Sequence, residues 1–141
     1  MIYLDTSILA AIFFREPDAT NLVDWLEKQR PTLSTSSWTL TEMASASGIK
    51  ERTGQIDATG RAEGMAAFDR FTADMLTMIE IVNGDFRVAR VLIEAPPISL
   101  RAGDALHLAV CRRTRATLVT LDSKMAQAAT HYNIPISSPA Q

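Results

Sequence analysis

The sequence contains little cysteine and no long apolar run. Its one cysteine, Cys111, excludes an internal disulfide framework and is typical of a protein in a reducing compartment. The apolar stretch 8–14 is far shorter than the roughly 20 residues that cross a bilayer. The first residues carry no basic segment and no small-residue cleavage site, so we expect no signal peptide. These absences predict a cytoplasmic protein that makes no use of a membrane.

The charge shows no excess of one sign. Lys and Arg number 14 and Asp and Glu 16, which gives a net charge of −2. This balance alone argues against a nucleic-acid-binding protein, unless several carboxylates share one pocket and leave the remaining surface basic. Five basic residues lie in the last third of the chain, and they fit either a solvated face or a binding surface. They are Arg101, Arg112, Arg113, Arg115 and Lys124.

A phosphate-binding loop and an internal repeat are also absent. The pair Gly60 and Gly64 follows no apolar strand and lacks the Lys-Ser/Thr ending of such a loop. Hydrophobic periodicity and turn residues instead predict the order β-α-α-β-α-α-β-α-α-β-α-β. The expected strands are 2–4, 32–36, 78–82, 118–121 and 134–136. The expected helices are 7–14, 19–29, 38–52, 57–76, 85–94, 104–111 and 123–132, with breaks at Arg30-Pro31, Thr53-Gly54 and Ala95-Pro96-Pro97.

Strands that alternate with helices predict an α/β fold with a mainly parallel sheet of four to five strands, covered on both faces. At this length we expect one domain, residues 1–141. In the third helix, Leu40, Met43 and Ala44 have the spacing of a packing face, and Glu42 lies off its centre. The second strand is rich in Ser and Thr and is the least apolar of the five.

Two apolar strands end in the same way. Asp5, followed by Thr6 and Ser7, comes after residues 2–4, and Asp122, followed by Ser123, comes after residues 118–121. In open parallel sheets, ligands bind at the carboxyl ends of the strands. Each Asp could alternatively serve only as the N-cap of the helix that follows it. Capping does not require an apolar strand to end in an acid twice, so this recurrence favours a functional site.

Two further acids point to the same edge of the sheet. Asp104 begins a helix that is apolar nearly all round, and Glu42 lies in the first turns of the helix after the second strand. Alternatively, Asp104 is only an acid favoured by the helix dipole, and Glu42 is an exposed helix acid. If Asp5, Glu42, Asp104 and Asp122 converge, their charges require protonation or a hard cation such as Mg²⁺ or Mn²⁺.

These acids receive distinct candidate roles. Asp5, Asp104 and Asp122 are candidate metal ligands, and Glu42 is a ligand through water or a general base. The hydroxyls of Thr6, Ser7 and Thr120 are candidate hydrogen-bond partners that orient the carboxylates. His107, three residues after Asp104, could be a ligand or a base but is interpreted as a core residue. Cys111 is also interpreted as a core residue, because it has no Cys or His partner at metal-ligand spacing. The predicted catalytic set is Asp5, Glu42, Asp104 and Asp122.

Four segments of the chain carry a resemblance to a known family. They are Tyr3-Leu-Asp5-Thr-Ser7, Leu40-Thr-Glu42, Gly103-Asp104-Ala-Leu-His-Leu-Ala and Leu118-Val-Thr-Leu-Asp122. In this order and at this length, the sequence resembles PIN-domain proteins, in particular VapC-type toxins of bacterial toxin–antitoxin pairs. The resemblance covers essentially the whole chain. It implies a three-layer α/β/α sandwich, a Mg²⁺- or Mn²⁺-dependent endoribonuclease, a cognate antitoxin that covers the site, and a homodimer.

The leading hypothesis is therefore hydrolysis of RNA by water, which leaves a 3′-hydroxyl and a 5′-phosphate. A phosphatase that uses Asp5 as a covalent nucleophile is an alternative, but that chemistry favours a second acid where Ser7 stands. A receiver-like signalling domain would require an acid at the end of the third strand, where Asp85 comes late. A non-catalytic α/β binding module is the third class, and it predicts that metal has no effect.

Overall fold

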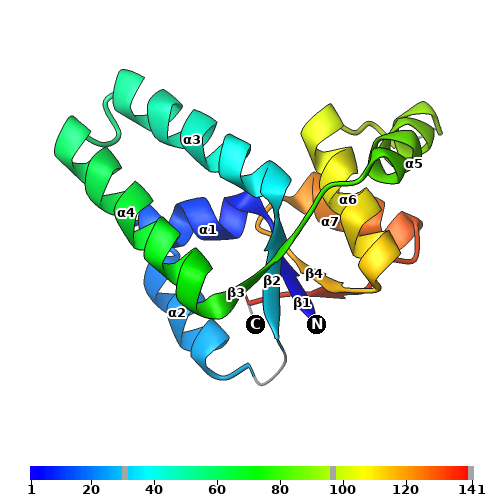
Figure 1. Cartoon of the computed structure of the whole chain (residues 1–141), viewed down its shortest axis with the longest axis horizontal. Helices are drawn as coiled ribbons and strands as arrows, with labels where there is room; N and C mark the ends of the chain where they lie inside the picture. Colours follow the sequence, from blue (N-terminus) through cyan, green and yellow to red (C-terminus); the bar gives the residue numbers. More distant parts are fainter. Residues whose placement is uncertain (30–31, 96–97, 140–141) are drawn as a thin grey trace.

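The computed structural model describes residues 1–29, 32–95 and 98–139, and its element order is the predicted one (Figure 1). The strands are β1 (Ile2–Leu4), β2 (Leu33–Ser36), β3 (Leu76–Ile79), β4 (Thr117–Val119) and β5 (Ile136–Ser137). The helices are α1 (Thr6–Phe13), α2 (Ala19–Glu27), α3 (Ser37–Arg52), α4 (Ala58–Met75), α5 (Asn83–Glu94), α6 (Ala102–Thr114) and α7 (Ser123–His131).

The five strands form one sheet in the order β3-β2-β1-β4-β5, and every neighbouring pair is parallel. The predicted parallel sheet is thus confirmed. β1 lies at its centre, where Tyr3 is opposite Ser34 on one side and Leu118 on the other. Because all strands run the same way, the residues that follow β1 and β4 emerge at one edge of the sheet.

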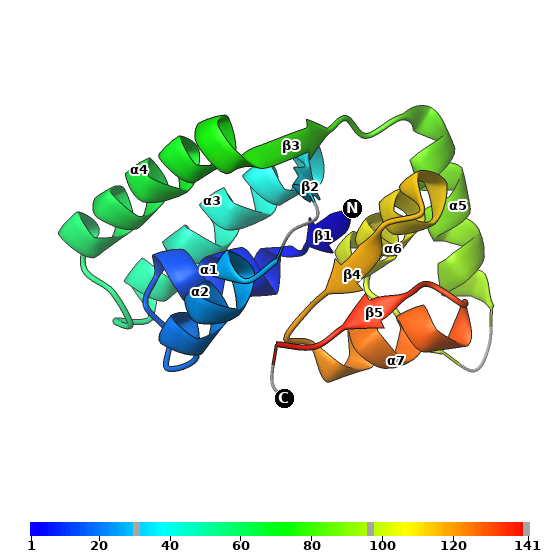
Figure 2. The ribbon, with the colours of Figure 1, turned by 90° about the horizontal axis from the view of Figure 1, so that it is seen from below.

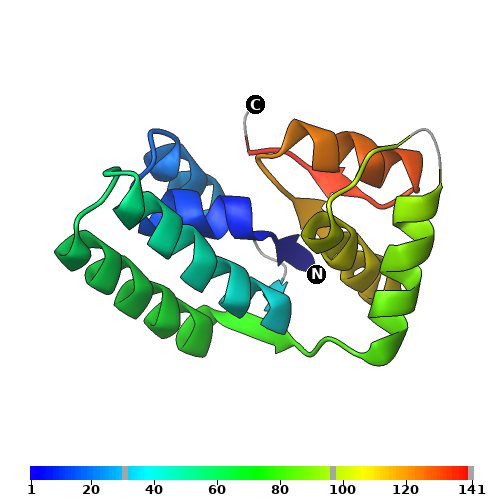
Figure 3. The same cartoon turned by 90° about the horizontal axis from the view of Figure 1, so that it is seen from above.

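Helices cover both faces of the sheet, which gives three layers. Figures 2 and 3 show α1 to α4 on one side and α5 to α7 on the other. Successive residues of β1 point to opposite faces. Ile2 and Leu4 belong to the core under α1 to α4, whereas Tyr3 packs with Leu108 and Leu118 under α6 and α7. No helix within the described ranges has the length and apolar character needed to cross a membrane.

The polar residues of the second strand are fully buried because their side chains find partners there. Ser34 Oγ donates to the Ile2 carbonyl at 2.8 Å, and Thr35 Oγ1 lies 2.8 Å from the Leu4 carbonyl. Ser34, Thr35 and Ser36 are each 0% exposed. Hydroxyls that find acceptors inside the protein avoid most of the cost of burial. The Ser/Thr-rich composition is therefore compatible with a central strand.

Two sequence-based expectations were wrong in detail. The third strand comes earlier than 78–82, because Ile79 pairs with Ser36, the last residue of β2, and no strand lies directly beyond it in the described chain. The backbone N–H of Ile81 instead donates to Ser37 Oγ at 3.1 Å. In α3 the expected packing face fails, because Leu40 is 41% exposed and Ala44 is also exposed.

The face of α3 that is buried contains Thr39, Met43 and Ser47. Thr39 is accommodated there because its hydroxyl forms a hydrogen bond of 2.7 Å with that of Thr35. Other element ends differ from expectation by a few residues, as hydrogen-bond-based boundaries commonly do. The breaks expected at Arg30-Pro31 and at Pro96-Pro97 lie outside the described residues.

Candidate active site

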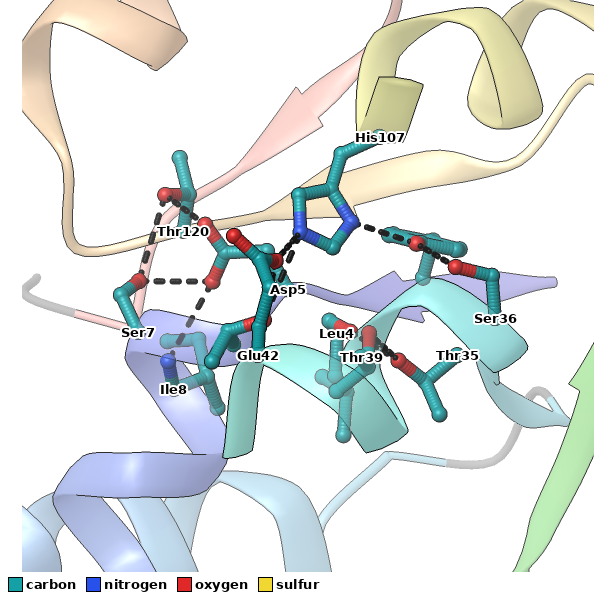
Figure 4. Close-up of polar contacts among 12 residues, drawn as sticks. Leu4, Asp5, Ser7, Ile8, Thr35, Ser36, Thr39, Glu42, His107 and Thr120 are labelled. Carbon is teal, nitrogen blue, oxygen red and sulfur yellow. Dashed lines mark hydrogen bonds and ion pairs between the residues drawn. The ribbon is translucent and has the colours of Figure 1, made fainter. Parts of the chain in front are cut away.

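Asp5 follows the central strand and is only 2% exposed. Its Oδ1 accepts hydrogen bonds from Ser7 Oγ at 2.6 Å and from the backbone N–H of Ile8 at 3.2 Å. The second contact makes Asp5 the N-cap of α1. Its Oδ2 accepts from Thr120 Oγ1 at 2.5 Å (Figure 4). Capping and a place in a carboxylate site, which the sequence left as alternatives, are therefore compatible for Asp5.

Burial raises the pKa of Asp5 above its ordinary value. The hydrogen bonds from Ser7, Thr120 and Ile8 oppose this rise but do not compensate for the loss of water. A carboxylate held in this way gains from a nearby positive charge. A cation bound beside Asp5 would therefore stabilise its ionised form.

Ser7 and Thr120 connect Asp5 to the loop after β4. The backbone N–H of Leu121 donates to Ser7 Oγ at 2.9 Å, and that of Asp122 donates to Thr120 Oγ1 at 3.0 Å. Each hydroxyl thus accepts from the loop and donates to Asp5. These two side chains thus link Asp5 by hydrogen bonds to the loop that carries Asp122.

Asp122 caps α7 with one oxygen. Its Oδ1 accepts from the backbone N–H groups of Lys124 and Met125 at 2.9 and 3.2 Å. Within the described residues its other oxygen takes part in no hydrogen bond. The side chain of Asp104, in the first turn of α6, makes no hydrogen bond with the described residues. Burial, followed by the negative charges of Asp122 and Glu42, raises the pKa of Asp104. Asp104 is thus close enough to both of these acids to be repelled by them.

Glu42 projects from the second turn of α3 toward α1 and α6. Its Oε1 accepts from Thr6 Oγ1 at 2.7 Å and makes a short hydrogen bond with Nε2 of His107. Burial alone would raise the pKa of Glu42, but the hydrogen bonds from His107 and Thr6 outweigh it and lower the pKa. Glu42 is therefore an ionised carboxylate fixed by hydrogen bonds. It is not the freely exposed helix acid that the sequence offered as an alternative.

Oε2 of Glu42 lies beside Gly103 on α6. A Cβ at position 103 would be 2.9 Å from this oxygen and 3.1 Å from Trp38 Nε1. The glycine therefore permits the close approach of α3 to the residue that precedes Asp104.

His107 is the residue that the sequence reasoning missed. It is a core residue, as expected, and is 1% exposed. However, it also bonds to Glu42 and to Tyr3, so it belongs to the site (Figure 4). Its position three residues after Asp104, on the same helix face, was the available signal. The sequence alone favoured a core residue, because the partners of His107, Tyr3 and Glu42, come from other segments of the chain.

Arg113 and Asp85 have a structural role instead. Asp85 caps α5, where its Oδ2 accepts from the backbone N–H of Val82 at 3.0 Å. Arg113 donates to both of its oxygens, at 2.8 and 2.9 Å. The other four basic residues of the last third, Arg101, Arg112, Arg115 and Lys124, are exposed.

The donor set fits a hard divalent cation in its chemistry. Carboxylate oxygens are the ligands that Mg²⁺ and Mn²⁺ prefer, and the repulsion felt by Asp104 is what a cation would relieve. Among the described residues, no three Asp, Glu, His or Cys side chains already enclose a common point. Asp104 is free of hydrogen bonds there, so its side chain can turn toward a cation without breaking a contact.

Comparison with known proteins places the chain in a family. The model of the PIN domain matches residues 2–130. Ribonuclease VapC47 of Mycobacterium tuberculosis is 27% identical over 142 residues, which cover 99% of this chain and 97% of that protein. Ribonuclease VapC35 of the same species is 27% identical over 147 residues, which cover 100% of this chain and 98% of that protein.

Solved structures share the fold. VapC20 of M. tuberculosis, described as a Sarcin-Ricin loop cleaving toxin, aligns with a TM-score of 0.71 at 15% identity, over 91% of this chain and 95% of that one. VapBC-1 of nontypeable Haemophilus influenzae aligns with a TM-score of 0.71 at 16% identity, over the full length of both chains. With the family match over nearly the whole sequence, these likenesses lead to one conclusion: the chain belongs to the PIN domain family.

Proposed function

We propose that this protein is a metal-dependent endoribonuclease that hydrolyses phosphodiester bonds in RNA. The proposal is supported above all by the positions of four acids, which follow strands or lie in the first two turns of helices at the carboxyl edge of the parallel sheet: Asp5, Glu42, Asp104 and Asp122. Two of these carboxylates, Asp5 and Asp104, have raised pKa values because burial or neighbouring charge disfavours their ionised forms. The ribonuclease names of the VapC relatives support the same activity.

A divalent metal ion is the cofactor that the family implies, and we propose Mg²⁺ or Mn²⁺. Asp5, Asp104 and Asp122 would hold it, and when bound it supplies an activated water and stabilises charge on the phosphoryl oxygens. Ser7 and Thr120 orient Asp5 through their hydrogen bonds at 2.6 and 2.5 Å. The fixed carboxylate of Glu42 serves as a ligand through water or as a general base that accepts a proton at Oε2.

The partners are part of the proposal. Several structural neighbours are toxin–antitoxin complexes, including one from Klebsiella pneumoniae. We therefore propose that residues 1–141 form one nuclease domain that acts in the cytoplasm, forms a homodimer and is inhibited by a cognate antitoxin. Its substrate is RNA. The exposed arginines Arg101, Arg112 and Arg115 are available for contacts with the phosphate backbone.

The test is cleavage of structured and unstructured RNA with Mg²⁺, with Mn²⁺ or with a chelator. We expect cleavage only with metal and products that carry a 5′-phosphate and a 3′-hydroxyl. Asp104→Asn should abolish cleavage without a loss of stability, because Asp104 makes no hydrogen bond with the described residues. Asp69→Asn, which changes an exposed acid of α4, is the matched control and should remain active. Cleavage that persists in Asp5→Asn or Asp104→Asn would reject the assignment.

A further inference from the structure

A chain of buried hydrogen bonds runs from the second strand to Glu42. Ser36 Oγ lies 2.8 Å from the hydroxyl oxygen of Tyr3, and this oxygen lies 2.6 Å from Nδ1 of His107. Nε2 of the same ring bonds to Oε1 of Glu42. Ser36 and Tyr3 are 0% exposed and His107 is 1% exposed, so water does not satisfy these groups.

The direction of each hydrogen bond follows from counting hydrogens. The hydroxyl of Ser36 is fully buried, and its hydrogen-bond partner within the described residues is Tyr3. If Tyr3 donated to Ser36, the hydrogen of Ser36 would be buried without an acceptor, which is costly. Ser36 therefore donates to Tyr3, and Tyr3 donates to Nδ1 of His107. Burial also raises the pKa of Tyr3 well above its ordinary range, so its phenol keeps the hydrogen that it donates.

The hydrogen bond between His107 and Glu42 is consistent with these donor directions. Oε1 of Glu42 is an acceptor only, so the ring nitrogen that faces it must carry a hydrogen. Nδ1 accepts and Nε2 donates, which defines one neutral tautomer of His107. In the opposite tautomer the lone pair of Nε2 would face the carboxylate and repel it. Ser36 and Tyr3, at the buried end of this series of hydrogen bonds, thus select the tautomer of His107 that donates to Glu42.

We propose that His107 is a positioning residue whose tautomer, set by Ser36 and Tyr3, holds Glu42 in place at the active site. The role of Glu42 in the reaction rests on the proposed function. Four segments meet at this histidine: Tyr3 comes from β1, Thr6 from α1, Glu42 from α3 and His107 from α6. Any buried histidine needs partners for both ring nitrogens. A positioning role is indicated here because one of those partners is Glu42.

With Oε1 occupied by Thr6 and His107, Oε2 of Glu42 is the oxygen that remains for the reaction. It lies on the side of Gly103, the neighbour of Asp104. His107 therefore acts on the reaction through the orientation of Glu42, without contacting the substrate. Donors that orient a catalytic carboxylate in this way typically contribute about 10- to 100-fold to activity.

The first test observes the tautomer by ¹⁵N NMR of the histidine side chains in the untagged protein. The chain has two histidines, and His131→Gln leaves the signals of His107 alone. We expect Nδ1 to resonate as an unprotonated ring nitrogen and Nε2 as a protonated one. Because Glu42 by itself also favours a protonated Nε2, the same spectra are recorded in Glu42→Gln, whose amide can either accept from the ring or donate to it. We expect the preference to persist in Glu42→Gln and to be lost in the double variant Glu42→Gln/Tyr3→Phe. A protonated Nδ1 in the parent protein, loss of the preference in Glu42→Gln alone, or the same pattern in both variants would overturn the proposal.

The second test compares two replacements of His107. The amide of Gln can place an N–H near the position of Nε2, whereas that of Asn reaches only as far as Nδ1. We expect His107→Asn to lose about 10- to 100-fold in kcat with little change in KM, and His107→Gln to recover most of it. His131→Gln is the control for activity. Equal loss in the two folded variants, or no loss in either, would contradict a positioning role.

The two proposals fail separately. If the parent protein cleaves no RNA under any metal condition, the proposed function fails. The NMR measurement does not require cleavage, so it still decides whether Tyr3 sets the tautomer that binds Glu42. Thermal unfolding of every variant identifies those that fail to fold. The comparison of Glu42→Gln with Glu42→Gln/Tyr3→Phe is then decisive, because the two variants differ by one oxygen atom only.

Discussion

Thr120 Oγ1 lies 2.5 Å from Oδ2 of Asp5 and accepts the backbone N–H of Asp122 at 3.0 Å. One hydroxyl thus connects the acids that follow β1 and β4. The contact is possible because the two strands are parallel neighbours, with Leu4 opposite Val119. The ends of β1 and β4 share a sequence pattern, and Thr120, a residue of that pattern, joins them.

Replacing Thr120 should reduce activity more than stability. Thr120→Val keeps the shape of the side chain but removes the donor to Asp5 and the acceptor for Asp122. We expect a loss of about 10- to 100-fold in RNA cleavage, the usual effect of removing a group that orients a metal-binding carboxylate. The matched control is Thr130→Val on α7, where the hydroxyl bonds, within the part of the chain that the structure describes, only to the Ala126 carbonyl of its own helix. Equal activity of the two variants would argue against the role of Thr120.

Asp5→Asn should change how stability depends on pH. Burial raises the pKa of Asp5 in the folded protein above the ordinary value of 3.8, so the folded state holds this proton more tightly than the unfolded chain. The free energy of unfolding contributed by Asp5 is therefore greatest below pH 3.8 and falls as the pH rises through the folded pKa.

The amide that replaces the carboxyl group in Asp5→Asn cannot ionise. The free energy of unfolding of the variant therefore does not fall at this position as the pH rises. The amide also has one acceptor oxygen in place of two, which costs stability at every pH. We therefore expect the free energy of unfolding of Asp5→Asn, relative to that of the parent, to increase as the pH rises from 3.8 to 7. Urea unfolding across this range measures it, without metal, while cleavage assays should show no activity. A relative stability that does not change with pH would contradict this account of Asp5.

The pair Arg113–Asp85 should have the opposite pH dependence. Burial alone would raise the pKa of Asp85, but hydrogen bonds from Arg113 outweigh it and lower the pKa. Ionised Asp85 therefore stabilises the folded protein above the pKa that this residue has in the unfolded chain. The stabilisation is lost as the pH falls through the lower pKa of Asp85 in the folded protein. Arg113→Met should cost about 1–3 kcal/mol at pH 7, because it leaves a buried carboxylate without its donor.

The control for this substitution is Arg112→Met, an exposed neighbour on the same helix. It should change stability by about 0.5 kcal/mol or less. RNA cleavage per folded molecule should not change in Arg113→Met, since the pair joins α5 to α6 by a structural contact. A large loss of activity with unchanged stability would place Arg113 in the substrate-binding surface instead.

Metal binding should stabilise the protein through Asp104. With free Mn²⁺ about a hundredfold above its dissociation constant, a site present only in the folded state adds about 2.7 kcal/mol. We expect the melting temperature to rise with Mn²⁺ in the parent and in the control Asp69→Asn. It should not rise in Asp104→Asn. A rise of equal size in all three proteins would place the metal elsewhere.

The arrangement of the fold followed from local patterns. Apolar strands, helix stripes and the caps at Asp5, Asp57 and Asp122 gave the element order, because each depends on residues close in sequence. The end of β3 did not follow from the sequence, since it is set by the last residue of its partner, Ser36, which is distant along the chain. The hydrophobic periodicity within one strand does not indicate where its partner strand ends.

The candidate site was predictable as a set of acids but not as a set of contacts. The acids follow strands or open helices, and a parallel sheet brings those positions to one edge. The bond between His107 and Glu42 joins residues 65 positions apart, and no spacing in the sequence indicates it. The same is true of the buried hydroxyls of β2, whose acceptors are carbonyls of β1.

Gly103 provides a test of how closely Glu42 must be held. A Cβ at this position would lie 2.9 Å from Oε2 of Glu42, a distance too short for either atom to keep its place. Because the oxygen ends a flexible side chain, the helix can remain while Glu42 moves. Gly103→Ala should therefore fold normally and lose about 10- to 100-fold in cleavage.

Gly84→Ala is the matched control for this substitution. Gly84 and Gly103 are each the second residue of their helices, α5 and α6, so alanine brings the same gain in helix propensity of up to about 1 kcal/mol. A Cβ at position 84 would meet no atom within 4 Å. We expect Gly84→Ala to keep full activity. If Gly103→Ala is equally active, Glu42 tolerates displacement, and its close approach to α6 is a feature of packing and not of catalysis.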